Sequence, residues 1–177
     1  MISKQELNQL KAFTRYDGFL LGMMMSATFI LTICSLAHPG YQFIALGILI
    51  ATPLFLGSRI CRYRDKIIMK KVSFRRALYY SLECFLYGGL ILGLVGYLYM
   101  RFVDGGAFLA SMTESLQMPE MKPVLDSYGL DANEVLTVMN DQRPIDIAFS
   151  LITNVFITGF FTSLIIATFL RREPARQ

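Results

Sequence analysis

Glu83 is the one acidic residue placed well inside a long apolar run of this sequence. An ionisable side chain within a membrane span is a candidate for binding or proton exchange, because an unpaired charge is costly in hydrocarbon. If Glu83 turns inward, its carboxyl group is expected to accept hydroxyl hydrogen bonds, and it could exchange a proton or hold a polar headgroup. Alternatively, Glu83 extends toward Arg75, Arg76 or the headgroups, because it lies roughly one to two turns inside the run.

Polar residues of two other apolar runs fall at the same depth as Glu83. Counting inward from the same side reaches Thr52 in one run and Thr162 and Ser163 in the last run. The last run also has a polar residue at every fourth position: Asp146, Ser150, Asn154, Thr158 and Thr162. Such a stripe occupies one helix face and is expected to turn inward, where it hydrogen-bonds to other helices. The predicted intramembrane polar site therefore consists of Glu83, Thr52, Asn154, Thr158, Thr162 and Ser163.

The cysteines and the single histidine do not form a pattern that predicts catalysis or metal binding. Cys34, Cys61 and Cys84 have no Cys or His at metal-ligand spacing, and His38 lies at a turn without a second ligand nearby. The sequence also lacks a Ser-His-Asp or Cys-His set and a glycine-rich phosphate loop. We therefore expect a protein that is not an enzyme and uses no metal or cofactor, with the cysteines as apolar packing residues.

The segment from Ser58 to Arg76 carries eight of the seventeen basic residues and a single acid, Asp65. A short loop rich in Lys and Arg between two apolar runs is held on the cytoplasmic side of a membrane. Its side chains are also expected to contact anionic headgroups, which contributes about 1 kcal/mol per residue near the surface. The candidates for this lipid contact are Arg59, Arg62, Arg64, Lys66, Lys70, Lys71, Arg75 and Arg76.

Four apolar runs are long enough to cross a bilayer, which requires about 20 residues. They cover residues 16–36, 41–60, 76–102 and 145–170, in a chain that is 54% apolar and 17% charged. The predicted fold is an all-α, integral membrane four-helix bundle that forms a single domain over residues 1–177. The basic loop places both termini in the cytoplasm and residues 103–144 outside it.

Small residues recur along two of the runs at a spacing that favours close helix contacts. Gly18, Gly22 and Ser26 are each four residues apart, and Gly89 and Gly93 form a GxxxG pair. Small side chains at this spacing form a ridge that lets the backbone of another helix approach. We expect these five residues to lie at helix–helix contacts.

The segment from 103 to 144 is acidic, with seven acids against two basic residues. Phe108, Met112 and Leu116 follow helical spacing, and Asp131 with Glu134 predicts the start of a second helix from Ala132 to about Met139. We expect helical pieces that lie on the outer membrane surface or over the mouth of the bundle.

The first fifteen residues have apolar positions near helical spacing, and Ser3 with Glu6 forms a capping-box pattern. They predict a surface helix that runs into the first span, or alternatively a solvated tail. Ser35-Leu36-Ala37 also imitates a signal cleavage site. Since the preceding run of about 19 residues exceeds a typical signal core, we expect an uncleaved anchor.

The sequence Tyr63-Arg64-Asp65 is followed by the segment from Val72 to Leu78. After this segment come a glycine-rich span, an acidic segment and a last span that ends in basic residues. In that order, these features resemble domain-of-unknown-function family 4199, a family of small four-helix bacterial inner-membrane proteins. The resemblance implies this fold and a multi-pass location in the bacterial cytoplasmic membrane. It also implies, loosely, an accessory role beside polyprenyl-phosphate sugar transfer. It implies no catalytic residues.

Two functions are compatible with these patterns. The first is a non-enzymatic accessory or scaffolding subunit of a larger membrane assembly, with a protein partner or a second copy of the chain. The alternative is a small transporter or lipid-handling protein that uses the polar site around Glu83. The expected partners are membrane lipids with anionic headgroups and another protein. Nucleic acid is not expected, because the basic residues flank apolar runs instead of forming one soluble face.

Overall fold

The regular structure of the chain is helical throughout the part that the computed structural model describes, residues 4–65 and 73–170. The long helices are α1 (Lys4–Cys34), α2 (Gly40–Tyr63), α3 (Phe74–Phe102) and α7 (Pro144–Leu170). The short elements are α4 (Ala107–Gln117), the 3-10 helix η2 (Pro119–Met121), α5 (Lys122–Tyr128) and α6 (Ala132–Asn140). The predicted all-α class is confirmed.

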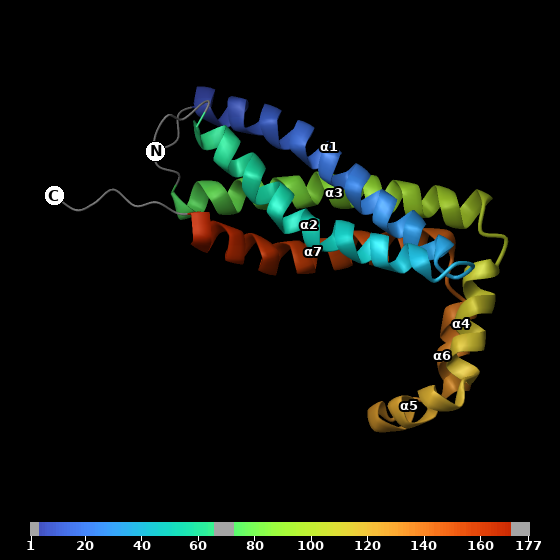
Figure 1. Ribbon diagram of the computed structural model, residues 1–177. Coiled ribbons are helices and arrows are strands. Elements are labelled where there is room, and N and C mark those ends of the chain that lie inside the picture. The colour runs from blue at the N-terminus through green and yellow to red at the C-terminus, as the bar shows by residue number, and fades with distance from the viewer. Residues whose placement is uncertain (1–3, 66–72, 171–177) are drawn as a thin grey trace.

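The four long helices lie side by side as a bundle (Figure 1), and each is long and apolar enough to cross a membrane. The candidate spans are Asn8–Cys34, Gly40–Tyr63, Phe74–Phe102 and Pro144–Leu170. They overlap the four predicted runs, with the first span beginning at Asn8 instead of residue 16, and they indicate a multi-pass membrane protein. Many apolar side chains on the outside of the bundle are exposed, as expected of helices that face lipid.

The start of α1 is the expected helix that runs into the first span, but it is not confined to the membrane surface. The helix runs without a break from Lys4 into the first span, and Leu10 and Thr14 are fully buried in it. Leu10 belongs to the same apolar core as Leu21 and Tyr80, so this end of α1 is part of the bundle. The predicted cap residue Ser3 lies outside the described residues.

Helix α3 is the centre of the bundle and packs along α1 and α7, whereas α2 packs chiefly on α1. Glycines set the close approach at both contacts. A Cβ atom added to Gly22 of α1 would lie 2.8 Å from the Cβ of Ile91, and one on Gly93 of α3 would lie 2.5 Å from Cγ1 of Ile152. Real Cβ atoms do not come this close to other atoms, so these positions accept only glycine without rearrangement.

The other small residues expected at helix contacts are placed in the same way. A Cβ on Gly18 would lie 2.7 Å from the Cβ of Tyr87, and one on Gly89 would lie 3.2 Å from Cγ1 of Val155. Ser26 is 5% exposed on α1. The two glycine ridges therefore face different neighbours, one joining α1 to α3 and the other joining α3 to α7.

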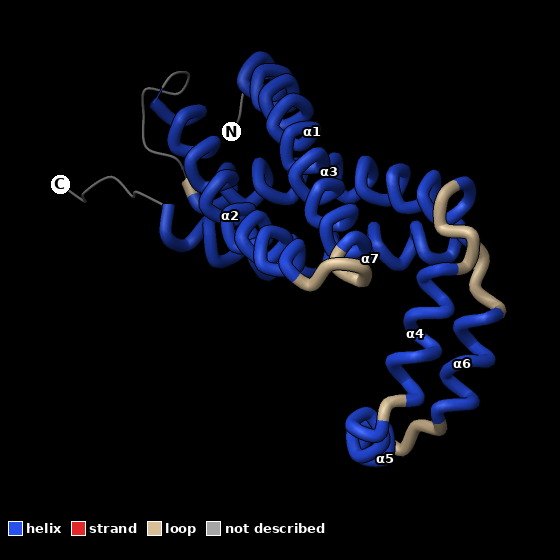
Figure 2. The backbone as a smooth tube through the Cα atoms, turned by 45° about the vertical axis from the view of Figure 1, so that its right-hand side comes forward, coloured by secondary structure: helices blue, strands red, loops and turns tan. Residues whose placement is uncertain are grey.

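The acidic arm, residues 103–144, leaves the end of the bundle and extends sideways from it (Figure 2). Its helices α4 and α6 lie side by side, and α5 lies at the tip. Asp131 caps α6 by accepting a hydrogen bond of 2.8 Å from the backbone N–H of Asn133, which confirms the predicted helix. The arm does not cover the mouth of the bundle, because the turn at Gly105 and Gly106 (φ 55° and 92°) directs the chain away from it.

Candidate functional site

A buried polar cluster joins three helices of the bundle. Asp17 of α1 is 4% exposed, and its carboxylate accepts a hydrogen bond from the hydroxyl of Tyr80 on α3. The second carboxylate oxygen lies 3.5 Å from Nε of Arg59 on α2. A buried carboxylate requires this kind of pairing, because removal from water strongly disfavours an unpaired charge. Asp17 is therefore the residue through which α1, α2 and α3 are joined by polar contacts.

Local spacing explains why Asp17 faces the bundle. Thr14, Asp17 and Leu21 are three and four residues apart, so their side chains share one face of α1. All three are buried. Gly18, next to Asp17, lets α3 approach closely, since its missing Cβ would lie 3.1 Å from the backbone oxygen of Cys84. This approach brings the side chain of Tyr80 within hydrogen-bonding reach of Asp17.

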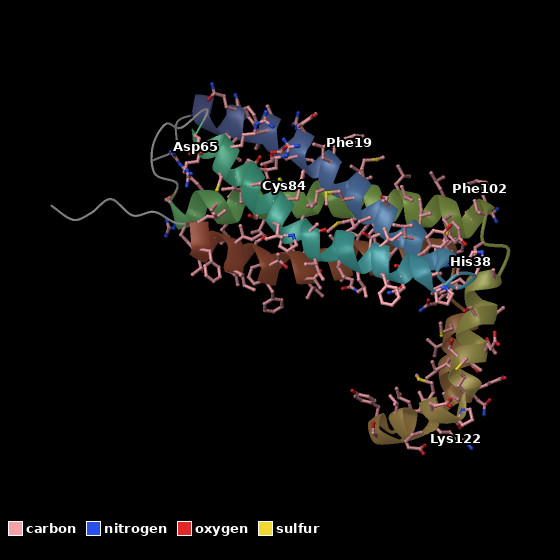
Figure 3. All side chains as sticks on the ribbon, viewed as in Figure 1. Phe19, His38, Asp65, Cys84, Phe102 and Lys122 are labelled. Atoms are coloured by element: carbon pink, nitrogen blue, oxygen red, sulfur yellow. The ribbon has the colours of Figure 1, made fainter. Side chains whose placement is uncertain are left out.

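Glu83 of α3 lies next to this cluster and also faces α1. The hydroxyl of Thr14 donates to Oε2 of Glu83 at 2.6 Å, and the Sγ of Cys84 donates to the backbone oxygen of Thr14 at 3.7 Å. Figure 3 shows Cys84 inside the bundle and Asp65 at the end where α2 leaves it. Glu83 is half-buried, so its carboxylate combines a partner on α1 with partial access to the surface.

Within the described part of the chain, no hydrogen bond links Glu83 to any of the other five residues of the predicted polar site. The Thr52 hydroxyl donates to the backbone oxygen of Ile48 at 3.0 Å, and the Thr162 hydroxyl donates to that of Thr158 at 2.8 Å. The buried hydroxyl of Ser163 has no hydrogen-bond partner within the described part of the chain. Glu83 therefore takes its hydroxyl partner from Thr14. Equal depth did not predict these contacts, because the hydroxyls of Thr52 and Thr162 donate to the backbone of their own helices, and the donor to Glu83 comes from Thr14 of α1.

The polar stripe of α7 does not turn inward as expected. Ser150, Asn154 and Thr158 are exposed on the outer side of the helix. The Thr158 hydroxyl donates to the backbone oxygen of Asn154 at 2.7 Å, whereas the Asn154 amide has no hydrogen bond to any described residue. A shallow groove of about 380 Å³ runs along this face and is lined by Phe149, Ser150, Thr153, Asn154 and Ile157. The inner side of α7 is instead occupied by small and apolar residues that pack on α3.

Asp146, the first residue of that stripe, has a local role at the start of α7. Its carboxylate accepts hydrogen bonds from the backbone N–H and from Nε of Arg143, both at 3.0 Å. These contacts satisfy one of the free N–H groups at a helix start. They also raise the pKa of Arg143, first through the side-chain hydrogen bond and then through the charge of Asp146.

A pocket of about 420 Å³ lies beside the buried cluster, between α1 and α2. Its lining residues are Phe13, Tyr16, Asp17, Arg59, Arg62 and Tyr63. The pocket was not predicted from the sequence. The sequence does contain a pattern that indicates its walls: residues 13, 16 and 17 share one helix face, and residues 59, 62 and 63 share another.

The basic residues expected to contact lipid differ in their surroundings. Arg59 is turned toward Asp17, and 21% of its side chain is exposed. Arg64 pairs with Asp65 at 2.6 Å, and this hydrogen bond raises the pKa of Arg64. Arg62 and Arg75 are exposed and Arg76 is half-buried. Lys66, Lys70 and Lys71 lie outside the described residues.

Metal-ligating side chains are dispersed. Over residues 4–65 and 73–170, no group of three or more His, Cys, Asp or Glu side chains is placed to hold a metal ion. Cys84 is buried, Cys61 is half-buried and Cys34 is exposed. His38 lies in the turn between α1 and α2, with its ring 6.1 Å from that of Tyr41.

A family model described as "Protein of unknown function (DUF4199)" matches residues 16–172. The chain belongs to this family. The matched part of this DUF4199 protein includes most of the first candidate span, all of the other three and the acidic arm, so the resemblance noted in the sequence is confirmed. Neither a curated protein nor a solved structure matches the chain.

Proposed function

We propose that this protein is a non-enzymatic accessory or scaffolding subunit of a larger membrane assembly, and that the outer face of α7 is the surface that contacts a neighbouring membrane helix. The observation that carries the proposal is the exposed amide of Asn154 in the groove of α7. A neighbouring helix from a protein partner or a second copy of the chain would cover this amide.

The exposed amide of Asn154 supports the proposal because the residue lies near the middle of the membrane. The residue lies ten positions after the start of α7 at Pro144. At 1.5 Å per residue this corresponds to about 15 Å, half of a hydrocarbon core about 30 Å thick. A primary amide without a partner in hydrocarbon costs several kcal/mol, roughly 4–8 on transfer scales that allow no hydrogen bond. A facing helix with a polar side chain removes this cost, and Ser150 and Thr153 supply further hydroxyls in the same groove.

The acidic arm supports the same function through a second surface, outside the span region. Exposed apolar side chains gather around its tip: Met118, Val124, Tyr128 and Leu130. Among the arm's side chains that the structure describes, Leu125 is the one buried apolar residue, so this part of the arm has little core of its own. Acidic charge around an apolar tip is suited to a partner with a basic and apolar surface.

The proposal includes a topology and a location. We place both termini and the basic segment of Ser58–Arg76 in the bacterial cytoplasm, and the acidic arm outside it, because Lys and Arg concentrate at one end of the bundle. An accessory role beside polyprenyl-phosphate sugar transfer rests on the family resemblance alone. The alternative of a small transporter around Glu83 has less support, since no hydrogen bond joins Thr52, Thr162 or Ser163 to that carboxylate within the described part of the chain.

The test compares Asn154→Leu with Thr168→Val. The Thr168 hydroxyl already donates to the backbone oxygen of Leu164 at 2.8 Å, so its removal deletes an exposed polar group of α7 that needs no other chain. Each variant is cross-linked in native membranes, extracted in neutral detergent, and measured for the mass of the complex. We expect Asn154→Leu to lower the cross-linked fraction by about fivefold, which corresponds to about 1 kcal/mol per interhelical hydrogen bond. Equal cross-linking of both variants and the parent would show that the α7 face is not the interface.

A further inference from the structure

The pocket between α1 and α2 combines positive charge with aromatic walls. Arg59 and Arg62 contribute two guanidinium groups, and Asp17 contributes one carboxylate. These three charges sum to +1. The carboxylate of Asp17 is already engaged by Tyr80 and Arg59, so it is not available for a cation. The pocket is therefore suited to an anion that carries one negative charge.

The two guanidinium groups are placed to share such an anion. Arg59 directs Nε toward Asp17 at 3.5 Å, and its Cζ lies 4.9 Å from the centroid of the Phe55 ring, so its terminal NH₂ groups supply further hydrogen-bond donors. Arg62 lies three residues further along α2, is exposed, and pairs with no described acid. A guanidinium group binds two phosphate oxygens through two parallel hydrogen bonds, a geometry that the compact ammonium group of lysine does not provide. A phosphodiester has the matching charge of one and two free oxygens.

Depth and wall composition favour a phosphate that belongs to a lipid. Arg59 precedes the last residue of α2, Tyr63, by four positions, so it lies about 6 Å inside the helix end, near the headgroup level. The rings of Phe13 and Tyr63 are 5.5 Å apart, and Tyr16 is 61% exposed at the pocket edge. Aromatic rings at this level pack against the apolar part of a lipid while its polar part stays hydrated. A soluble anion has no apolar part to fill these contacts.

We propose that this pocket binds the phosphodiester headgroup of an anionic phospholipid, with the phosphate between Arg59 and Arg62 and the start of the acyl chains against Phe13 and Tyr16. Basic pockets between membrane helices are a general means of lipid headgroup recognition. The site is separate from the α7 face and does not depend on the proposed accessory function.

The experiment uses native mass spectrometry of the delipidated full-length protein in neutral detergent. Phosphatidylglycerol is titrated against the parent, Arg62→Gln and Arg75→Gln. Arg75 is the matched control because it is exposed in the first turn of α3 and does not line the pocket. Diacylglycerol with the same acyl chains tests binding without phosphate, and inorganic phosphate, added as a competitor, tests binding without a lipid tail. The thermal midpoint of each variant is measured to establish that it is folded. If Arg62→Gln is not folded, Arg62→Lys is used in its place.

We expect one tightly bound phosphatidylglycerol per parent chain, and at least tenfold weaker binding to Arg62→Gln, because a hydrogen bond between charged groups is lost. Arg75→Gln should bind like the parent, and diacylglycerol should bind at least tenfold more weakly than phosphatidylglycerol. An equal loss in the Arg62 and Arg75 variants would indicate diffuse charge attraction and overturn the proposal. Displacement of the lipid by inorganic phosphate at matched concentration would indicate a soluble-anion site and overturn the lipid assignment.

Discussion

The hydroxyl of Tyr80 on α3 donates a hydrogen bond to the carboxylate of Asp17 on α1, and both residues are less than 5% exposed. This contact joins two helices whose interface also contains the hydrogen bond from Thr14 to Glu83 and is otherwise formed largely by small and apolar residues. Hydrogen bonds to a charged group contribute about 1.5–3 kcal/mol, more than bonds between neutral groups. The contact therefore accounts for a sizeable share of the specificity with which α1 and α3 meet.

Tyr80→Phe should destabilise the bundle, because it leaves the Asp17 carboxylate with Arg59 alone. We expect a loss of about 1.5–3 kcal/mol in the free energy of unfolding, measured by denaturant titration in detergent. Tyr16→Phe is the control, since Tyr16 precedes Asp17 on the same helix and is 61% exposed. Similar midpoints for the two variants would contradict a stabilising role for this hydrogen bond.

Glycine replacement should distinguish helix contacts from lipid-facing positions. Gly22→Leu and Gly93→Leu place a side chain where a Cβ alone would lie under 3 Å from Ile91 or Ile152. Overpacking of this kind costs about 1–3 kcal/mol or more. Gly47→Leu is the matched control in α2, because nothing lies within 4 Å of its added Cβ. Thermal midpoints that fall equally for all three variants would argue against these helix contacts.

The hydrogen bond between Thr14 and Glu83 can be measured with a double-mutant cycle. The single variants Thr14→Val and Glu83→Leu and the double variant are compared by their unfolding free energies. The Thr14 hydroxyl also lies 3.1 Å from the backbone oxygen of Lys11, which can accept its proton when Glu83 is absent. We therefore expect a modest coupling of about 0.5–1.5 kcal/mol. Additive single effects would mean that the two side chains do not stabilise each other.

The proposed topology predicts different accessibility for two exposed serines. Ser73 precedes α3 at the basic end of the bundle, and Ser127 lies in α5 of the arm. Each is replaced by cysteine in a background without Cys34, Cys61 and Cys84. A membrane-impermeant thiol reagent on intact spheroplasts should label position 127 and spare position 73. Labelling at position 73 without labelling at position 127 would show that the orientation in the membrane is the opposite of the proposed one.

Much of the fold follows from patterns that are local in the sequence. Apolar run length predicts the four spans, and the Asp131 and Glu134 pair predicts the start of α6. The spacing of Gly18 and Gly22 also predicts a packing face. Each of these signals depends on residues within one helix, so no knowledge of the neighbouring helices is required.

The candidate site was less predictable, because it depends on how the helices are rotated against one another. Periodicity assigns Asn154 and Thr158 to one face of α7, but it does not say whether that face meets α3 or lipid. Asp17 was not predicted as a site residue because it lies at the start of the first apolar run, two residues after Arg15, where charged residues are common. Its position between Thr14 and Gly18 on the packing face was the available signal.

The pairing of Asp17 with Tyr80 also bears on how the chain is made. The two residues are 63 positions apart, so Asp17 enters the insertion machinery well before its hydrogen-bond donor is synthesised. At roughly 5–20 residues per second, the delay is about 3–13 seconds. During this interval the first helix carries a carboxylate without its buried partners. Insertion of α1 is therefore expected to be completed only when α3 arrives, which couples the placement of the first span to the synthesis of the third.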